Sequence, residues 1–431
     1  MTSFPWVIFI ALALVWLSAS GAISDSLELN DCLKLAEIRN PRYKISSHAV
    51  DAANLSLKEL EVQRYPQIKY KGSLEYAPIS HHFGYDPSLT NGGLLGSQIV
   101  VEQTIYDGGQ RRLKLKQLEL DLARTGHEKR VSNNELRYDI EVAFTELLRA
   151  QAVADLKRRS HIQLQGYLKL VQRMQGGGQA GYTDVLKTKI QMSEANSEWN
   201  EAEVEMVVDN YTLADLIGLS KVDSLKIKGS LEDLDVSSKV ESVQKGDTVQ
   251  NSEFEIARMD IQAAQLDAKI AGAEWKPILS VFADMGLLTS WENLDAPSNS
   301  RANMLGSSLG LHVDWPLFNW GLKGLRARQK LLTVETMQWQ FELKRRTLIA
   351  DYRKSELQWK AVKDKLDSEK ENVEAAKDNF LLTQSKYAGG SGLASDVLEA
   401  HRLWVETQLS LLRARADLRL LNAKMRRLNV H

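Results

Sequence analysis

Apolar positions between residues 136 and 154 have the spacing of a coiled-coil seam. They recur at intervals of four and three residues, at Leu136, Ile140, Ala143, Leu147, Ala150 and Ala154. This spacing places the apolar side chains on one narrow stripe of a helix, and the alanines allow a second helix to pack closely. Proline is absent between residues 88 and 276 and after residue 316. We therefore predict a helix from about 109 to 175, roughly 100 Å long.

The second half of the chain has a similar but less regular apolar pattern. Its positions are Leu332, Val334, Trp339, Leu343, Leu348 and Tyr352. A second long helix is therefore expected after residue 316.

Segments that contain proline alternate between apolar and polar residues instead. Ile68, Tyr70 and Leu74 lie between lysines, serine and glutamate, and Leu309, Leu311 and Val313 lie between serine, glycine, histidine and aspartate. Alternation places one kind of side chain on each face of a strand, and an apolar outer face is typical of a membrane barrel. The sequence predicts four strands, at 67–77, 97–106, 278–289 and 307–318, with exposed loops at 78–96 and 290–306.

Four strands are too few to close a barrel. An open edge in lipid leaves backbone N–H and C=O groups unpaired at a cost of several kcal/mol each. Two or more copies of the chain must therefore share one barrel, and three copies would supply twelve strands.

The chain carries an internal duplication. Pro66 precedes Pro277 by 211 positions, and Asp184-Val185-Leu186 recurs 212 positions later as Asp396-Val397-Leu398. Tyr106-Asp107-Gly108-Gly109 is echoed by Phe318-Asn319-Trp320-Gly321 at the same offset of 212. We predict two repeats, at 30–219 and 250–430, joined by a polar connector at 220–250.

The first residues predict secretion. An apolar run from Trp6 to Leu17 is followed by small residues, so we expect a signal peptide at 1–22 with cleavage after Ala22. The alternative, an uncleaved anchor, is disfavoured because the run is short for a membrane span. The only cysteine, Cys32, cannot form an intramolecular disulfide and is expected to pack in a helix. The formal net charge of -1 gives no basic field for a nucleic-acid partner.

The order of these elements resembles the TolC family of outer-membrane efflux proteins. The motifs that carry the resemblance are Ile105-Tyr106-Asp107-Gly108-Gly109-Gln110-Arg111 and the two Asp-Val-Leu segments. It implies a mainly α fold with a small β part. The duplicated helical hairpins would form an α-barrel, and four strands per chain would join a shared 12-stranded β-barrel in a homotrimer.

The resemblance also implies a location and partners. The protein would lie in outer-membrane lipid of a Gram-negative bacterium, with a large periplasmic part. It would conduct passively, without a cofactor or enzymatic activity. Its partners would be a periplasmic adaptor (membrane fusion protein) and an inner-membrane pump of the resistance-nodulation-division, ABC or major facilitator type.

The turns at 176–184 and 388–396 correspond to the periplasmic tips at which family adaptors dock. The expected docking residues are Gly177, Gly178, Gln179, Gly181, Thr183, Asp184, Val185, Leu186, Gly389, Gly390, Ser391, Gly392, Ser395, Asp396, Val397 and Leu398. The leucine that follows glycine in the family motif is replaced by Gln179 and Ser391. These residues also have a local interpretation, because glycine suits a tight turn and Thr, Ser or Asp suits a helix start.

Four charged residues near the tips are candidates for ion pairs between neighbouring helices that would close the channel. They are Arg173, Lys187, Lys386 and Glu399. The alternative is that they are solvated surface charges worth under about 1 kcal/mol each. Aromatic residues of the strand regions, including Tyr70, Tyr76, Trp275, Trp291 and Trp315, are candidates for an interfacial girdle.

Other functions find less support. The chain has no GxxxxGK[ST] phosphate loop and no Gly-x-Ser-x-Gly elbow. His81-His82 has no third metal ligand nearby in sequence, which favours a loop over a metal site. A periplasmic adaptor would have one hairpin beside a lipoyl-like domain, and a coiled-coil scaffold would need no alternating strands.

Overall fold

The computed structural model describes residues 26–77, 92–219, 225–231, 251–291 and 304–429. The predicted signal peptide, most of the connector and His81-His82 lie outside these residues. The described chain divides into two compact units. The first contains residues up to 46, 130–251 and 346–431, and the second contains 47–129 and 252–345.

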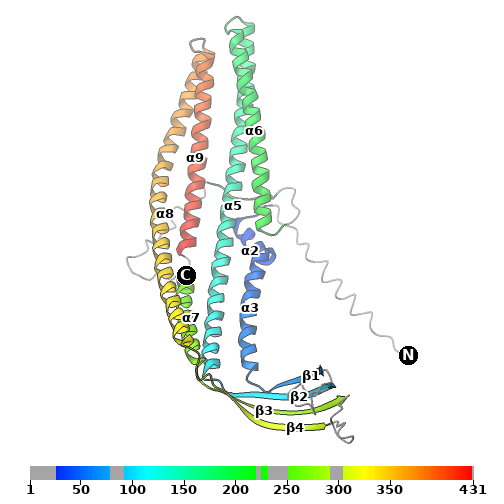
Figure 1. Cartoon of the computed structure of the whole chain (residues 1–431). Helices are drawn as coiled ribbons and strands as arrows, with labels where there is room; N and C mark the ends of the chain where they lie inside the picture. Colours follow the sequence, from blue (N-terminus) through cyan, green and yellow to red (C-terminus); the bar gives the residue numbers. More distant parts are fainter. Residues whose placement is uncertain (1–25, 78–91, 220–224, 232–250, 292–303, 430–431) are drawn as a thin grey trace, which may run out of the picture. The chain divides into compact units, whose positions relative to one another are not determined.

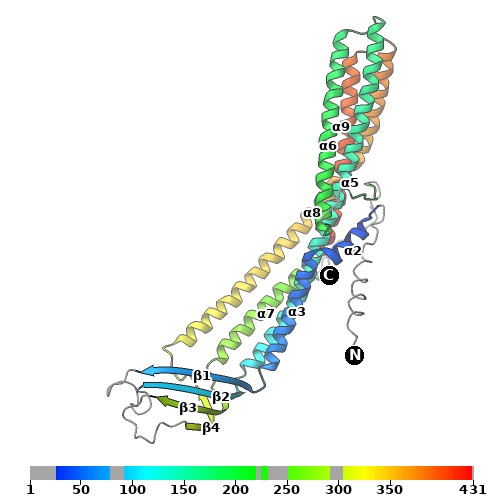
Figure 2. The same ribbon diagram turned by 90° about the vertical axis from the view of Figure 1, so that its right-hand side faces the viewer.

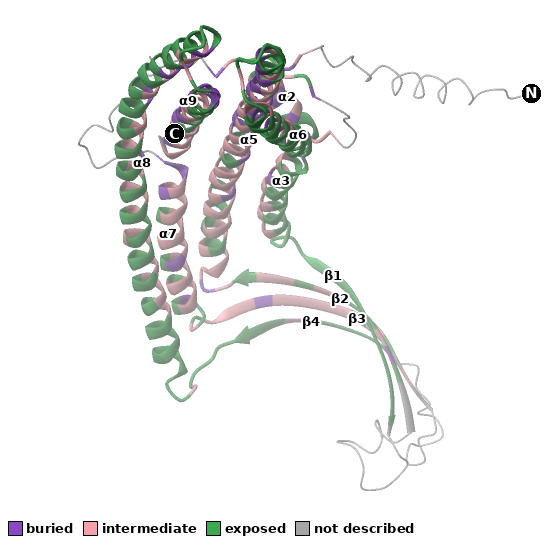
Figure 3. Ribbon diagram, turned by 90° about the horizontal axis from the view of Figure 1, so that it is seen from above, coloured by how far each residue is buried: buried purple, intermediate pink, exposed green. Residues whose placement is uncertain are grey.

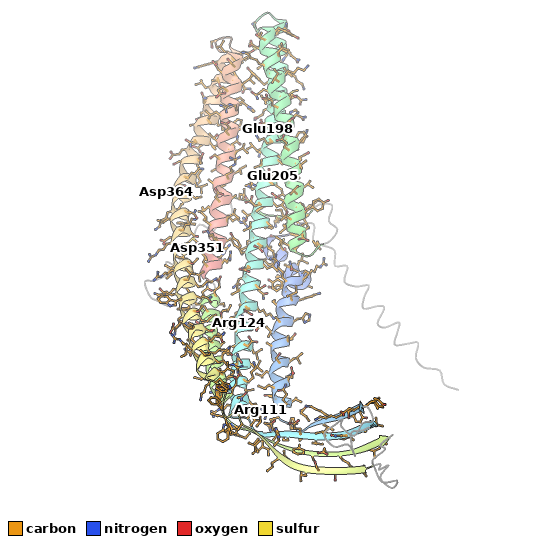
Figure 4. All side chains as sticks on the ribbon, viewed as in Figure 1. Arg111, Arg124, Glu198, Glu205, Asp351 and Asp364 are labelled. Atoms are coloured by element: carbon orange, nitrogen blue, oxygen red, sulfur yellow. The ribbon has the colours of Figure 1, made fainter. Side chains whose placement is uncertain are left out.

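The second unit is built on a four-stranded antiparallel sheet in the order β1-β2-β3-β4. The strands are β1 (Gln67–Ala77), β2 (Gly92–Tyr106), β3 (Ile278–Trp291) and β4 (Met304–Asp314). Helices α3 (Pro41–Val62), α5 (Gln110–Gly176), α7 (Ser252–Ala273) and α8 (Leu322–Ala388) meet the strand ends on one side of the sheet (Figure 1). In this unit, Arg124 of α5, which is labelled in Figure 4, pairs with Asp260 of α7 at 3.0 Å.

The predicted strands are present, but four of their bounds were wrong. β2 begins at Gly92 because all eleven residues of β1 pair with it, from Gln67 with Glu102 to Ala77 with Gly92. The glycines of this segment suggested a loop, yet a glycine can pair in a sheet when its neighbour is extended. Likewise, β3 continues to Trp291 and β4 begins at Met304. β4 ends at Asp314, before Pro316, which has no N–H to donate to a sheet.

The first unit is helical. It contains α2 (Leu29–Arg39), α6 (Tyr182–Leu216), α9 (Ala394–Asn429) and the C-terminal parts of α5 and α8, and the four long helices lie side by side in both views (Figures 1 and 2). Helices α5 and α8 each have 67 residues, and the long helix predicted from about 109 to 175 is confirmed. Among the described residues, no helix is both long and apolar enough to cross a membrane.

The predicted seam of α5 forms the core of the first unit. Leu136, Ile140 and Leu147 are fully buried, together with Phe144 of the same helix. They pack against Leu213 and Ile217 at the end of α6 and against residues of α2. Cys32 of α2 is also fully buried in this cluster, and burial raises the pKa of its thiol to about 11, so it is a packing residue.

Candidate functional site

The two helix-to-helix turns of the first unit are closed by the same backbone hydrogen bonds. At the end of α5, the N–H of Gln179 donates to the carbonyl of Met174 at 2.8 Å, and the N–H of Gly178 donates to Gln175 at 3.0 Å. At the end of α8, Ser391 donates to Lys386 at 3.0 Å and Gly390 donates to Tyr387 at 2.9 Å. Both arrangements are Schellman motifs, which satisfy carbonyl groups that the helix end leaves free.

Glycine is required at one position of each turn. Gly178 has φ 76° and Gly390 has φ 77°, a left-handed conformation that other residues rarely adopt. A Cβ atom at either position would meet nothing within 4 Å. The requirement is therefore one of backbone conformation and not of space.

The helices that follow begin earlier than the predicted caps. α6 begins at Tyr182 with Gly181 as its N-cap, so Thr183 and Asp184 lie inside the first turn. The Asp184 carboxylate accepts a hydrogen bond from the N–H of Gly181 at 3.3 Å, which satisfies a free donor and places negative charge at the positive helix end. In the second turn, the N–H of Asp396 donates to Leu393, and the Ser395 hydroxyl donates to the Asp396 carboxylate at 3.4 Å.

The surfaces of the two turns differ. Leu186 is 43% exposed and Val185 is half-buried, whereas Val397 is 1% and Leu398 is 8% exposed. Gln179 and Ser391, which replace the family leucine, are both exposed. The structure therefore brings Val397 and Leu398 into the helical core and leaves Leu186 partly exposed.

Two buried tyrosines complete the turn region. Tyr167 of α5 and Tyr387 of α8 are 5% and 4% exposed, and their ring centroids are 5.7 Å apart. Neither hydroxyl has a hydrogen-bond partner within the part of the chain that the structure describes. Burial is the main cause that raises the pKa of both phenols, and the negative charge of Asp184 adds a smaller rise to each.

Sequence reasoning missed these tyrosines, although a signal for one was present. Leu164, Tyr167, Val171 and Met174 continue the apolar seam of α5 at intervals of three and four residues. All four are buried in one cluster with residues of α6, α8 and α9. The seam therefore reaches the turn itself, and Tyr167 is a member that carries a polar atom.

The four candidate gate residues are all exposed. Glu399 pairs with Arg402 on its own helix at 2.6 Å, and this interaction lowers the pKa of Glu399. The Arg173 guanidinium donates to the carbonyl of Lys169 at 3.4 Å. Arg173, Lys187 and Lys386 have no carboxylate partner among the described residues.

A cavity of about 580 Å³ lies between α5, α6 and α9. Its charged lining residues largely pair with each other: Lys157 with Glu198 at 2.6 Å, and Arg402 with Glu406 at 2.5 Å. His401 lies on its wall, 4% exposed, and contacts the Gln163 side-chain oxygen at 3.3 Å. Within the described ranges, no three His, Cys, Asp or Glu side chains are placed to hold a metal ion.

Comparison with known proteins identifies relatives by family and by fold. The family model described as "Outer membrane efflux protein" matches residues 32–219 and 248–428. No curated protein matches the chain significantly.

Three solved structures illustrate the likeness in fold. The outer membrane protein VceC of Vibrio cholerae has a TM-score of 0.74 and 16% identity, with 93% of this chain and 96% of that chain covered. The CmeC outer membrane channel of Campylobacter jejuni has a TM-score of 0.76 and 13% identity, covering 93% and 85%. The open MtrE outer membrane channel of Neisseria gonorrhoeae has a TM-score of 0.73 and 14% identity, covering 93% and 88%.

Proposed function

Because the chain belongs to the outer membrane efflux protein family, we propose that it is the passive exit duct of a tripartite efflux or type I secretion system. Its sheet would lie in the outer membrane of a Gram-negative bacterium, and its helices would extend into the periplasm. An inner-membrane pump would supply the energy, and a periplasmic adaptor would connect the two. The duct itself would need neither a cofactor nor a catalytic residue.

The observation that carries this proposal is the open sheet. β1 pairs with β2 and β4 pairs with β3, so each outer strand has one edge with no partner among the described residues. Apolar side chains on these strands are exposed: Ile68 is 73%, Leu305 is 75% and Leu309 is 79% exposed. A free edge with an apolar face is stable in lipid only when another strand pairs with it. Three copies would close the sheet with twelve strands.

The surface of α8 supports the same assembly. Trp339, Leu343 and Leu357 of this helix are 73%, 66% and 67% exposed, and α8 is exposed along most of its length (Figure 3). In a homotrimer these side chains would be covered by the neighbouring protomer, so that the helices form a closed α-barrel. The repeats would then be 30–219 and 250–430, with the connector between them.

The two turns would be the periplasmic tips at which the adaptor docks. The exposed Leu186 and Gln179 make the first turn the stronger candidate for direct contact. A cysteine placed at Gln179 in a Cys32→Ser background should crosslink to the adaptor in cells. A cysteine at Ser391 in the same background is the matched comparison. If neither cysteine crosslinks to the adaptor, the adaptor does not dock at the tips.

The duct proposal is tested by membrane extraction and by conductance. The protein should remain in the membrane after a carbonate wash and, after purification in detergent, should form stepwise ion channels in planar bilayers. Release by carbonate would instead favour a periplasmic scaffold.

The gate proposal needs a separate test. Replacing Arg173 with Glu reverses a charge that has no carboxylate partner among the described residues of its own protomer, so a closing ion pair with a neighbour would become a repulsion. Conductance of the closed channel should rise in Arg173→Glu, while Arg353→Glu on α8 should leave it unchanged. Equal conductance in both variants would show that Arg173 is only solvated.

A further inference from the structure

The junction between β4 and α8 exposes an unusual number of large apolar side chains. Trp315 is 56%, Phe318 is 72% and Trp320 is 89% exposed. The rings of Phe318 and Trp320 meet edge to face with centroids 4.9 Å apart. Contiguous apolar surface of this kind marks a site of interaction.

Trp320 has a backbone conformation that favours glycine. Its φ is 55°, and it is the only residue other than glycine with positive φ in the described chain. The corresponding residue of the first repeat, 212 positions earlier, is Gly108 with φ 69°. A tryptophan that replaces glycine in a left-handed turn, and is then left exposed, is a strained arrangement that indicates a role for the side chain outside the fold.

Basic residues follow the aromatic ones without any acidic residue between them. From 315 to 334 the chain has Lys323, Arg326, Arg328 and Lys330 and no Asp or Glu. From 108 to 118, at the equivalent junction between β2 and α5, it has Arg111, Arg112, Lys114 and Lys116 and again no Asp or Glu.

Part of this charge is used inside the protein. Arg326 pairs with Glu274 at 3.2 Å, Lys330 pairs with Asp267 at 3.4 Å, and Lys323 lies over the Trp275 ring at 5.5 Å. The Arg111 guanidinium, labelled beside the sheet in Figure 4, donates to the carbonyl of Gln63.

Three cations of the two junctions are not used in this way. Arg112, Lys116 and Arg328 are exposed and form no ion pair within the described ranges. We call these three the basic set. They are available to an anionic ligand outside the protomer.

We propose that Trp320 and the basic set bind the phosphate-bearing headgroups of anionic phospholipids, in the membrane leaflet nearest the helices. An indole ring prefers the boundary between acyl chains and headgroups, where its ring is in an apolar zone and its N–H reaches polar groups. Arginine and lysine just beyond that boundary would meet the phosphates. This inference rests on the proposed function, because it requires the sheet to lie in a membrane.

Charge favours an anionic ligand beside this edge of the sheet. In the proposed assembly a neighbouring protomer would bring its β1 to β4, and with it Arg64, which lies between α3 and β1, and Lys69 and Lys71 of β1. Like charges of the two chains would then come near each other. Phosphate groups are complementary to the cations of both chains.

The first test uses phospholipids brominated on their acyl chains, which quench nearby tryptophan fluorescence. Wild type and Trp320→Gly are reconstituted in vesicles of phosphatidylcholine brominated at a shallow or a deep position. The substitution introduces the residue type found at the equivalent turn of the first repeat, so this variant should fold. The difference between the two proteins reports Trp320, and we expect the shallow bromines to quench it more strongly than the deep ones.

The matched control is Trp339→Phe. Trp339 is 73% exposed but lies roughly 25 Å further along α8, so its removal should leave the quenched fraction of fluorescence almost unchanged. If Trp320→Gly also leaves that fraction unchanged, Trp320 is covered by protein and the proposal is wrong. If even the wild type shows no bromolipid quenching, the sheet does not reach lipid and the proposed function itself fails.

The second test measures selectivity for the headgroup. Quenching of Trp320 by brominated phosphatidylglycerol is compared with quenching by brominated phosphatidylcholine. We expect a preference for phosphatidylglycerol of about fivefold, which corresponds to about 1 kcal/mol. The variant Arg112→Gln/Lys116→Gln/Arg328→Gln should lose the preference, and Arg353→Gln/Lys354→Gln, which removes two exposed cations of α8 in the other unit, should keep it. Equal quenching by both lipids in the wild type would overturn the role of the basic set.

Discussion

Helices α5 and α8 have the same length and the same place in their repeats, but they differ in what covers them. α5 buries Leu136, Ile140 and Leu147 completely. α8 leaves Trp339, Leu343 and Leu357 about two-thirds exposed or more. The two repeats therefore have the same long helix, but α5 is packed against other helices of its own chain, whereas these side chains of α8 are exposed.

The two return helices differ in the same manner. His401 of α9 is buried against Phe380, with ring centroids 5.3 Å apart. The corresponding residue of α6, 212 positions earlier, is Lys189, which is exposed. α9 is thus the inner helix of its pair and α6 the outer one. Equivalent positions in a duplicated chain need not have equivalent environments.

The largest expected effect is a difference between α5 and α8 in how much a truncated leucine lowers the free energy of unfolding. Leu147→Ala should lower the free energy of unfolding by about 2–5 kcal/mol, because it leaves a cavity in a fully buried site. Leu357→Ala removes the same atoms from a side chain that is 67% exposed, so a dissociated protomer should lose less than about 0.5 kcal/mol. Chemical denaturation of the dissociated chain measures both values, and similar losses would break the comparison.

The next effect concerns the inner position of His401. Burial lowers the pKa of this imidazole from 6.5 to about 4. As the pH falls, His401 is therefore protonated in the unfolded chain at a higher pH than in the folded chain. Stability supplied by the neutral ring is complete above about pH 6.5 and is lost on acidification towards pH 4, by on the order of 3 kcal/mol.

His401→Gln is the variant that isolates this effect. Denaturation at several pH values should give a shallower fall in stability between pH 6.5 and 4 in the variant than in the wild type. Parallel curves would show that His401 can accept a proton without unfolding its surroundings.

The smallest expected effect is a loss of stability at the two turns, where the repeats have the same backbone conformation. Gly178→Ala and Gly390→Ala should each cost about 1 kcal/mol, because alanine is disfavoured at positive φ. The two losses should agree closely, since a Cβ atom meets nothing within 4 Å at either position. Thermal unfolding would measure them, and a much larger loss at one turn would reveal a contact that only that turn makes.

Much of the fold could be predicted from the sequence because its elements have strong periodic signals. The interval of four and three residues located α5, and the absence of proline bounded it. Strand ends were less predictable, since Gly92 to Gly96 has the composition of a loop and pairs only because β1 is long enough to reach it. Pairing depends on a partner strand, which local composition does not contain.

The positions of the docking turns could be predicted from the repeated glycines and the Asp-Val-Leu segments. The burial of their side chains could not. Val185 and Val397 occupy identical places in the repeats, yet only Val397 is fully buried. That difference arises from which helix is the inner member of each pair. The partnerless hydroxyls of Tyr167 and Tyr387 within the described chain were missed for the same reason, because they depend on packing between helices from both repeats.

The central claim is that one chain supplies only part of a closed sheet. Native mass spectrometry of the protein, extracted from carbonate-washed membranes in detergent, tests it most directly. The account predicts particles with the mass of three protomers. A water-soluble single chain that never associates with detergent would contradict it.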